Sequence, residues 1–343
     1  MTNQEEKIGG KLKPKEKAVA DKKTATVDAV RKYVDQLAKV NPFEDFRKLE
    51  NQKNTKPCMK WETVGKKKGA KCLDGNLVKL EDTKIFINAA TIQNSSFCLG
   101  KLPKLDDTDE CRLFWLMMSE LKANAHLIVA EDEVENLAKL FSLRTSEVAS
   151  LESVVQYQGL TVNTRCVEKD FAKNGSDVSQ FIVEIMVEGQ SESHFSKIYV
   201  HCGWKKGYAL SDLTHIWGSA QLVNQSSIEP SDGRHINVVL CSGHGSGRNA
   251  TVLSLACGIQ MLEDGRVPDL LHIVESLRSD RPGAVETPMQ YASLYLAVNS
   301  YAMKAISGDS SAQRVYKACA AFGDRVAAIA RQSPGMLLEK APK

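Results

Sequence analysis

The stretch NVVLCSGHGSGR, residues 237–248, carries the strongest structural signal in this 343-residue chain. The apolar run at its start predicts a buried strand, and the apolar residues over 249–262 predict a helix behind it. Glycines between the two let backbone N–H groups converge, while the start of the helix adds positive potential. An arginine at that junction can hold two oxygens of a tetrahedral anion. The stretch therefore predicts an anion-binding loop, with a tight turn that binds nothing as the alternative.

The expected anion-binding residues are those of the loop and the first residue of the helix. They are Ser242, Gly243, His244, Gly245, Ser246, Gly247 and Arg248. The loop is not of the Walker type, because no Gly-Lys-Ser/Thr follows the glycines.

Residue periodicity on both sides of the loop predicts the remaining elements. Helical spacing predicts helices near residues 27–37, 44–49, 110–123, 214–225, 268–277, 287–303 and 310–330. Short apolar or alternating runs predict strands at 78–80, 84–87, 127–130, 153–158, 160–168, 181–187 and 197–201. Together these elements predict an α/β or α+β domain, with a central mixed sheet flanked by helices.

The loop also resembles the signature His-Cys-Ser-x-Gly-x-Gly-Arg of the classical protein tyrosine phosphatases. Further motifs stand in that family's order, and the resemblance covers most of residues 26–303. These motifs are Phe86-Ile87-Asn88-Ala89, Phe114-Trp115-Leu116-Met117, Val200-His201-Cys202-Gly203-Trp204, the stretch 277–285 and Thr287-Pro288-Met289-Gln290-Tyr291. The resemblance implies a protein-tyrosine-phosphatase-like domain, and the many substitutions indicate a divergent member similar to the expanded nematode branch.

The nucleophile of the family is altered in this chain. The resemblance implies a cysteine thiolate that the loop keeps ionised. An alignment without gaps places Ser242 at that position and Cys241 at the preceding histidine. The rival register makes Cys241 the nucleophile, but it leaves six residues before Arg248 where the family has five. Ser242 is therefore the favoured assignment, and a serine hydroxyl stays protonated unless a base is positioned beside it.

The other positions that carry the family's chemistry are altered as well. The resemblance places Lys206 at the general-acid aspartate, Glu286 at the glutamine that orients water, and Asn249 after the signature arginine. The loop residue His244 is expected to be solvated. Losing a general acid typically costs about 10²–10⁴ in rate. We therefore expect no catalytic residue, and we predict a pseudophosphatase rather than an enzyme.

The rim of the expected pocket is partly basic. The resemblance implies a rim formed by Lys67, Trp204, Lys206 and Gln290, with Lys67 where the family has the tyrosine that packs on phosphotyrosine. If the loop that follows Trp204 closes, Lys206 would face Glu286 and pair with it in the empty site. An open loop with Lys206 in solvent is the alternative, and for Lys67 the alternative is a solvated loop.

Charge and composition narrow the possible partners. Of the formal net charge of +3, all comes from residues 1–25, and the remainder holds 38 basic and 38 acidic residues. A neutral body argues against a nucleic-acid-binding surface, except through the basic terminal segment. No apolar run approaches the length of a membrane helix, and no secretory signal opens the sequence. Nine scattered cysteines fit a reduced protein, so a cytoplasmic or nuclear location is expected, with no metal or cofactor.

Three segments are expected along the chain. Residues 1–25 are predicted to be a disordered basic arm, 26–305 the phosphatase-like domain, and 306–343 a C-terminal helix and tail. An apolar stripe on that helix is expected to pack on the domain, with packing on another chain as the alternative. The stripe consists of Val315, Cys319, Phe322, Val326 and Ile329.

Three functions are compatible with these features. The favoured one is an inactive phosphatase-like protein that binds a phosphorylated or acidic protein segment, or scaffolds a complex. A weakly active phosphatase that uses Cys241 is the first alternative. A structural interaction module that holds no anion is the second. The identity of the partner and the oligomeric state do not follow from the sequence.

Overall fold

The computed structural model describes residues 14–52, 72–80, 85–92, 97–123, 125–131, 140, 152–168, 178–204, 213–226, 236, 238–243 and 245–332. The helices within these ranges are α1 (Pro14–Leu37), α2 (Pro42–Asn51), η2 (Asp74–Asn76, a 3₁₀ turn), α3 (Thr108–Leu121), α5 (Leu213–Ser226), α6 (Arg248–Glu263), α7 (Leu270–Asp280), α8 (Pro288–Ala305) and α9 (Ala312–Gln332). None of these described helices combines the length and the apolar character that a membrane span requires.

The described strands form one mixed sheet. They are β1 (Leu77–Leu80), β2 (Ile85–Ile92), β3 (Phe97–Lys101), β4 (Ala125–Val129), β5 (Glu152–Tyr157), β6 (Leu160–Glu168), β7 (Val178–Val187), β8 (His194–His201) and β9 (Val238–Ser242). Their order is β1-β2-β3-β9-β4-β8-β7-β6-β5. The pairs β3–β9, β9–β4 and β4–β8 are parallel, and the flanking pairs are antiparallel. The carboxyl end of β9 therefore emerges between those of β3 and β4.

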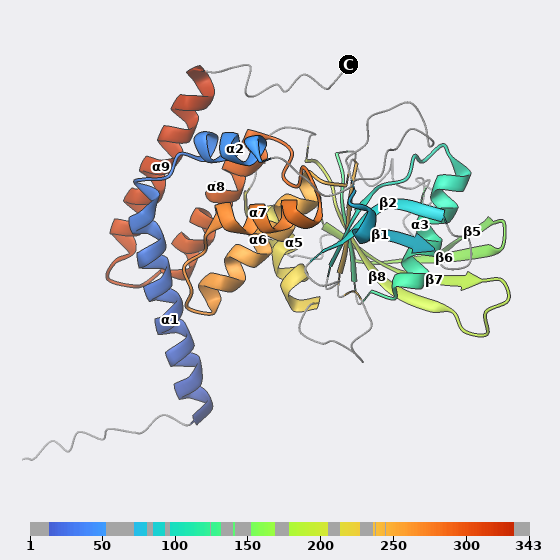
Figure 1. The fold of residues 1–343 in the computed structure, drawn as a ribbon. Coiled ribbons are helices and arrows are strands. Elements are labelled where there is room, and N and C mark those ends of the chain that lie inside the picture. Colours follow the sequence, from blue (N-terminus) through green and yellow to red (C-terminus); the bar gives the residue numbers. More distant parts are fainter. Residues whose placement is uncertain are drawn as a thin grey trace, which may run out of the picture.

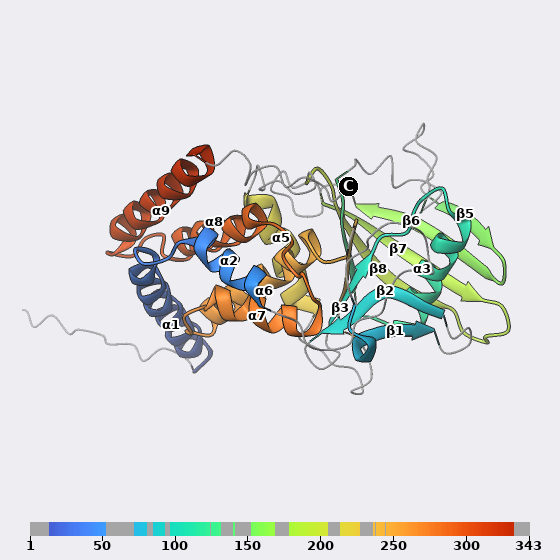
Figure 2. The same cartoon turned by 45° about the horizontal axis from the view of Figure 1, so that its top comes forward.

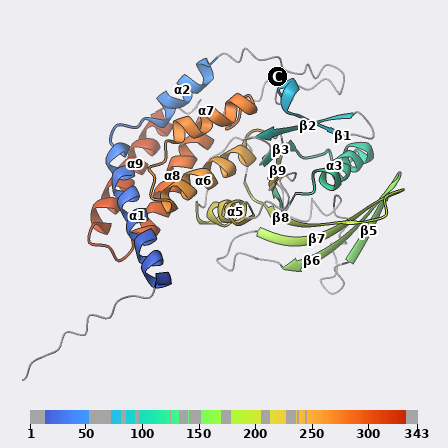
Figure 3. The same ribbon diagram turned by 60° about the horizontal axis from the view of Figure 1, so that its bottom comes forward.

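Two hydrophobic layers cover the two faces of the sheet (Figure 1). Helices α1, α2 and α5–α9 build the larger layer, which we call the helical side. Helix α3 builds the smaller layer on the opposite face, the α3 side. Figure 3 shows β9 beside β3, between these two layers. The mixed sheet with helices on both faces confirms the predicted fold class.

Helix α9 packs on its own domain, as expected. Its apolar stripe enters the helical side, where Phe322 is fully buried and its ring lies 5.6 Å from that of Tyr295. Helix α1 lies beside α9 (Figure 2), and Arg31 of α1 pairs with Asp309 at 2.8 Å. A second ion pair joins Arg314 to Asp35. The segment after residue 305 is therefore continuous with the domain core.

Two predictions differ from the structure. Helix α1 begins at Pro14, so residues 14–25 are helical although the sequence predicted a disordered arm up to residue 25. The reason is local: Pro14 has the φ that a first helical turn requires, and the alanines, lysines and Glu16 that follow are good helix formers. Strand β3 was not predicted, because its short sequence FCLGK contains a glycine and shows no alternation.

Candidate functional site

Ser242 and Cys241 are neighbours on β9, but they belong to opposite faces of the sheet. Side chains alternate along a strand, and the apolar residues Val238 and Leu240 lie on the helical side. Cys241 lies on the α3 side, fully buried, where burial raises the pKa of its thiol to about 12. Ser242 falls on the same face as Leu240, toward the loop and α6. The Cys241 thiol thus stays protonated at neutral pH in an apolar layer.

The loop rests directly on β3. The backbone N–H of Leu102 donates to the Ser242 carbonyl at 2.9 Å. Gly245 has φ +77°, and a Cβ at this position would lie 2.7 Å from the backbone nitrogen of Lys101. A residue with a side chain would therefore be strained and would also collide with a main chain that cannot move away. Gly245 is required for the loop to cross β3 this closely.

Two polar side chains hold the loop from within the protein. Arg281 is fully buried, and its Nε donates to the Gly245 carbonyl at 3.2 Å. Burial lowers the pKa of Arg281 to about 10, a shift opposed by the nearby carboxylate of Glu286. Asn249 donates from Nδ2 to the Leu240 carbonyl at 3.1 Å, which ties the first turn of α6 to β9. The loop is therefore anchored at both ends.

The positioning roles of Arg281 and Asn249 were not predicted from the sequence. The available signal for Arg281 was its place in the Arg-Pro-Gly part of the family-like stretch 277–285. For Asn249, the only available signal was that this position, directly after the signature arginine, differs from the family.

Arg248 begins α6 and is directed toward the start of the loop. Its Nη2 atom would lie 3.0 Å from a Cβ placed on Gly243, so the guanidinium borders the loop backbone. Its Nη1 donates to the Trp204 carbonyl at 2.5 Å, and the residue is 7% exposed. The indole of Trp204 is itself buried in the helical side. The sequence analysis placed Trp204 at the pocket rim. In the structure its large apolar ring is a core residue, and its carbonyl accepts the hydrogen bond from Arg248.

Glu286 lies over the loop. Its Oε1 accepts a hydrogen bond from Ser246 Oγ at 2.6 Å, and its Oε2 would lie 2.7 Å from a Cβ placed on Gly247. The backbone N–H of Glu286 donates to Gln290 Oε1 at 2.9 Å, and Gln290 is buried beside the loop. Glu286 and Gln290 are therefore brought to the loop, as the sequence predicted for the pocket, while the Ser246 contact was not foreseen.

Several predicted residues lie outside the described part of the chain. They are Lys67, Lys206 and His244. The expected pair between Lys206 and Glu286 is consequently a prediction still. Ser242, Gly243, Gly245, Ser246, Gly247 and Arg248 are described and lie between the end of β9 and the start of α6, while their binding of an anion stays a prediction.

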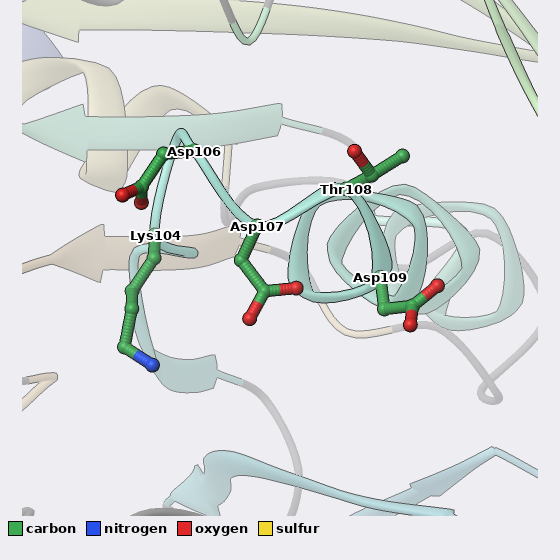
Figure 4. A pocket seen from close by; sticks show the side chains of 5 residues that line it. All are labelled: Lys104, Asp106, Asp107, Thr108 and Asp109. Atoms are coloured by element: carbon green, nitrogen blue, oxygen red, sulfur yellow. The ribbon is translucent and has the colours of Figure 1, made fainter.

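A separate open depression of about 450 Å³ lies at the start of α3 (Figure 4). Its lining consists of Lys104, Asp106, Asp107, Thr108 and Asp109. Local roles account for two of these side chains: Asp107 accepts from the backbone N–H of Glu110 at 3.0 Å, and Lys104 pairs with Glu110. Within the described residues, no three His, Cys, Asp or Glu side chains are grouped to hold a metal ion.

Comparisons with known proteins place this geometry in a wider context. Residues 63–300 match the family model described as protein-tyrosine phosphatase. Two Caenorhabditis elegans proteins with provisional tyrosine-protein phosphatase names are 26% and 24% identical over 80% and 64% of this chain, and 63% and 52% of their own lengths. The mouse receptor-type tyrosine-protein phosphatase alpha is 26% identical over 64% of this chain and 25% of its own. The chain thus spans less than two thirds of the length of the curated relatives it matches.

Solved structures share the fold at low sequence identity. The Trypanosoma cruzi protein tyrosine phosphatase TcPTP1 superposes with a TM-score of 0.60 at 16% identity, over 78% of this chain and 96% of its own. PTPN18 superposes with a TM-score of 0.61 at 16% identity, over 81% of this chain and all of its own. At this identity the likeness concerns the fold alone.

Proposed function

The chain belongs to the protein-tyrosine phosphatase family, and on that premise we propose that it is a catalytically inactive member that binds a phosphorylated or acidic segment of a partner protein. The observation that carries the proposal is the pairing of a retained anion loop with a serine at its base. Arg248 and the glycine turn are present, while Ser242 takes the side of β9 that faces the loop. The groups that would bind an anion are thus present, whereas the family's nucleophilic cysteine is absent from the base of the loop.

Serine catalysis requires a base positioned beside the hydroxyl. Among the described residues, no side chain forms a hydrogen bond with the Ser242 hydroxyl. An unassisted serine is a weak nucleophile because its proton remains in place at neutral pH. A neutral hydroxyl at the base of the loop also avoids the repulsion that a thiolate exerts on an incoming phosphate. The same substitution that disfavours turnover therefore favours simple binding.

One observation bears on each of the two alternative functions. The weakly active enzyme would need Cys241, whose thiol is buried on the opposite face of the sheet with its pKa raised to about 12. The structural module is favoured by the hydrogen bond from Arg248 to the Trp204 carbonyl, because part of the guanidinium is used internally. Anion binding would have to compete with such internal contacts of Arg248.

We place this binding inside the cell, in the cytoplasm or nucleus. Seven of the described cysteines form no disulfide, and six of these are buried. Free thiols are typical of reducing compartments.

The first test is hydrolysis of an aryl phosphate by the purified protein. We expect no turnover above a buffer blank, and none after Ser242→Cys alone, because Lys206 and Glu286 remain in place of the family's acid and glutamine. Turnover by the wild type that disappears in Cys241→Ser would contradict the proposal and establish the enzyme.

The second test separates an anion binder from a structural module. Arg248 would supply charge-assisted hydrogen bonds worth about 1.5–3 kcal/mol each, so Arg248→Met should weaken phosphotyrosine-peptide binding about tenfold or more. Arg314→Met is the control, because Arg314 is an exposed arginine on α9. Equal affinity in the wild type and both variants would favour the structural module.

A further inference from the structure

The loop already holds a negative charge that belongs to the protein. The Glu286 carboxylate accepts from Ser246 at 2.6 Å and reaches Gly247, the residue that precedes the first turn of α6. This is the end of a helix where an external anion is most stable, because the backbone N–H groups and the helix dipole point outward there. The Glu286 carboxylate thus lies at the start of α6, in the position that a bound phosphate would also need.

The carboxylate is held in place by its backbone. Val285 has φ +58°, a conformation that costs a β-branched residue of this kind free energy. The strain is maintained by a hydrogen bond from Val285 N–H to the Ser246 carbonyl at 2.8 Å and another from Arg278 to the Val285 carbonyl at 2.9 Å. Gln290 then binds the backbone N–H of Glu286 itself. Because the strained Val285 is held by hydrogen bonds on both sides, the backbone fixes where the neighbouring Glu286 carboxylate lies.

Glu286 offsets part of the positive charge around the loop. Arg248 and the buried Arg281 are the cations that border it among the described residues, and Arg281 feels the Glu286 carboxylate directly. A neutral glutamine in place of Glu286 would leave the positive charge of the loop uncompensated. Glu286 therefore lowers the attraction of the loop for an external anion.

We propose that Glu286 is an internal competitor, a carboxylate that occupies the anion loop and sets a threshold for what can bind there. A small free anion has too few contacts to displace it. A phosphorylated peptide can, because its neighbouring residues add contacts outside the loop. This inference rests on the proposed function, and it narrows the ligand from any phosphate to a phosphorylated protein segment.

The test uses inorganic phosphate as the probe and the full chain as the protein. Glu286→Gln removes the charge but keeps an oxygen that can accept from Ser246. A unit charge a few ångströms from the bound anion is expected to change affinity about tenfold or more at the effective dielectric of a protein surface. We therefore expect Glu286→Gln to bind phosphate at least about tenfold more tightly than the wild type, measured by calorimetry at constant ionic strength.

Glu184→Gln is the matched control. Glu184 lies on β7, which β4 and β8 separate from β9 in the sheet, and it also accepts a serine hydroxyl hydrogen bond, from Ser193 at 2.9 Å. It should leave phosphate affinity unchanged. Ser246→Ala is the second variant, because it releases the carboxylate without altering charge, and it should raise affinity by a smaller factor. Thermal melting of each variant checks that it is folded.

The outcomes separate this inference from the proposed function. Equal phosphate affinity in the wild type and Glu286→Gln, abolished in both by Arg248→Met, would overturn the role of Glu286 and leave the proposed function standing. A gain in Glu286→Gln that Arg248→Met abolishes would support both. If no variant binds phosphate and none binds a phosphotyrosine peptide, the proposed function is overturned and the inference with it.

Discussion

Ser242 and Cys241 are consecutive residues of β9, but they point to opposite faces of the sheet and meet different chemical environments. On the helical side, Ser242 meets a loop that is surrounded by Arg248, Arg281 and Glu286. On the α3 side, Cys241 meets only apolar neighbours and has no charged partner among the described residues. The environment of a side chain, and not its intrinsic reactivity, therefore decides whether it can take part in chemistry. A cysteine on the wrong face is only a packing residue.

The largest expected effect is on thiol reactivity. A cysteine introduced by Ser242→Cys would face the loop and the start of α6, where such thiols have pKa values of about 3.5–7.5. The pKa of Cys241 is about 12. At pH 7 we expect iodoacetamide to label the introduced cysteine at least about a hundredfold faster than Cys241, after allowing for the lower nucleophilicity of the more acidic thiolate.

Peptide mapping by mass spectrometry assigns the label to each cysteine. Cys241 in the wild type serves as the internal reference. Rapid labelling of Cys241 at neutral pH would contradict its assignment to the α3 side and would revive the rival register.

The next effect concerns the loop itself. Gly245→Ala combines a left-handed conformation with a collision against the backbone of β3, so it should lower the free energy of unfolding by about 3 kcal/mol or more. Gly283 has nearly the same φ, +78°, but open space where a Cβ would lie. Gly283→Ala should therefore cost only about 1 kcal/mol. Urea denaturation of both variants measures the difference, and equal losses would show that the approach to β3 is not limiting.

A smaller effect is expected from exchanging side chains across the strand. Cys241→Ser would bury a hydroxyl without a partner in the apolar layer, at a cost of about 1–3 kcal/mol. Ser242→Ala removes a hydroxyl that forms no hydrogen bond with described residues, and it should change stability by less than about 0.5 kcal/mol. The two free energies of unfolding come from the same denaturation experiment. A larger loss for Ser242→Ala would indicate an unrecognised partner of the serine.

The smallest expected effect is on the pH dependence of thermal stability, and it comes from Asp309, which lies on the helical side away from the loop. Hydrogen bonds from Ser311 and the guanidinium of Arg31 lower the pKa of Asp309 to about 2. A depressed carboxyl pKa stabilises the fold above the unfolded pKa of about 4, and this stabilisation is lost as the pH falls toward 2. Asp309→Asn should therefore lower Tm slightly at pH 6, and the gap to the wild type should close as the pH approaches 2. A constant gap would mean that the contribution of Asp309 is not ionic.

The elements with strong periodicity were predictable from the sequence. The apolar stripe of α9 predicted its packing on the domain, and Val315, Cys319, Phe322 and Val326 are buried as expected. Strand β9 and helix α6, on either side of the loop, also follow the prediction. In both cases the local sequence pattern is enough to predict the element, because the apolar stripe of α9 and the glycine turn after β9 each determine the local structure.

Other features depend on contacts between distant segments. The run VVLCS is apolar or small throughout, so alternation is invisible in the sequence, and only the packing of the folded sheet assigns Cys241 to the α3 side. The contact between Ser246 and Glu286 joins residues 40 positions apart through the strained Val285. No periodicity signals such a contact. The burial of Trp204 likewise follows from the helices that surround it, which a motif cannot convey.

The packing of α1 has a consequence for how the chain is made. Helix α1 is synthesised before α6, α8 and α9, the helices against which it packs. At about 5–20 residues per second, the nascent chain carries α1 for tens of seconds before its binding surface exists. During that time the apolar residues Val27, Val30, Val34 and Leu37 have no native cover. Helix α1 therefore cannot bury its hydrophobic face until α9 has left the ribosome, and until then that face is a binding site for chaperones.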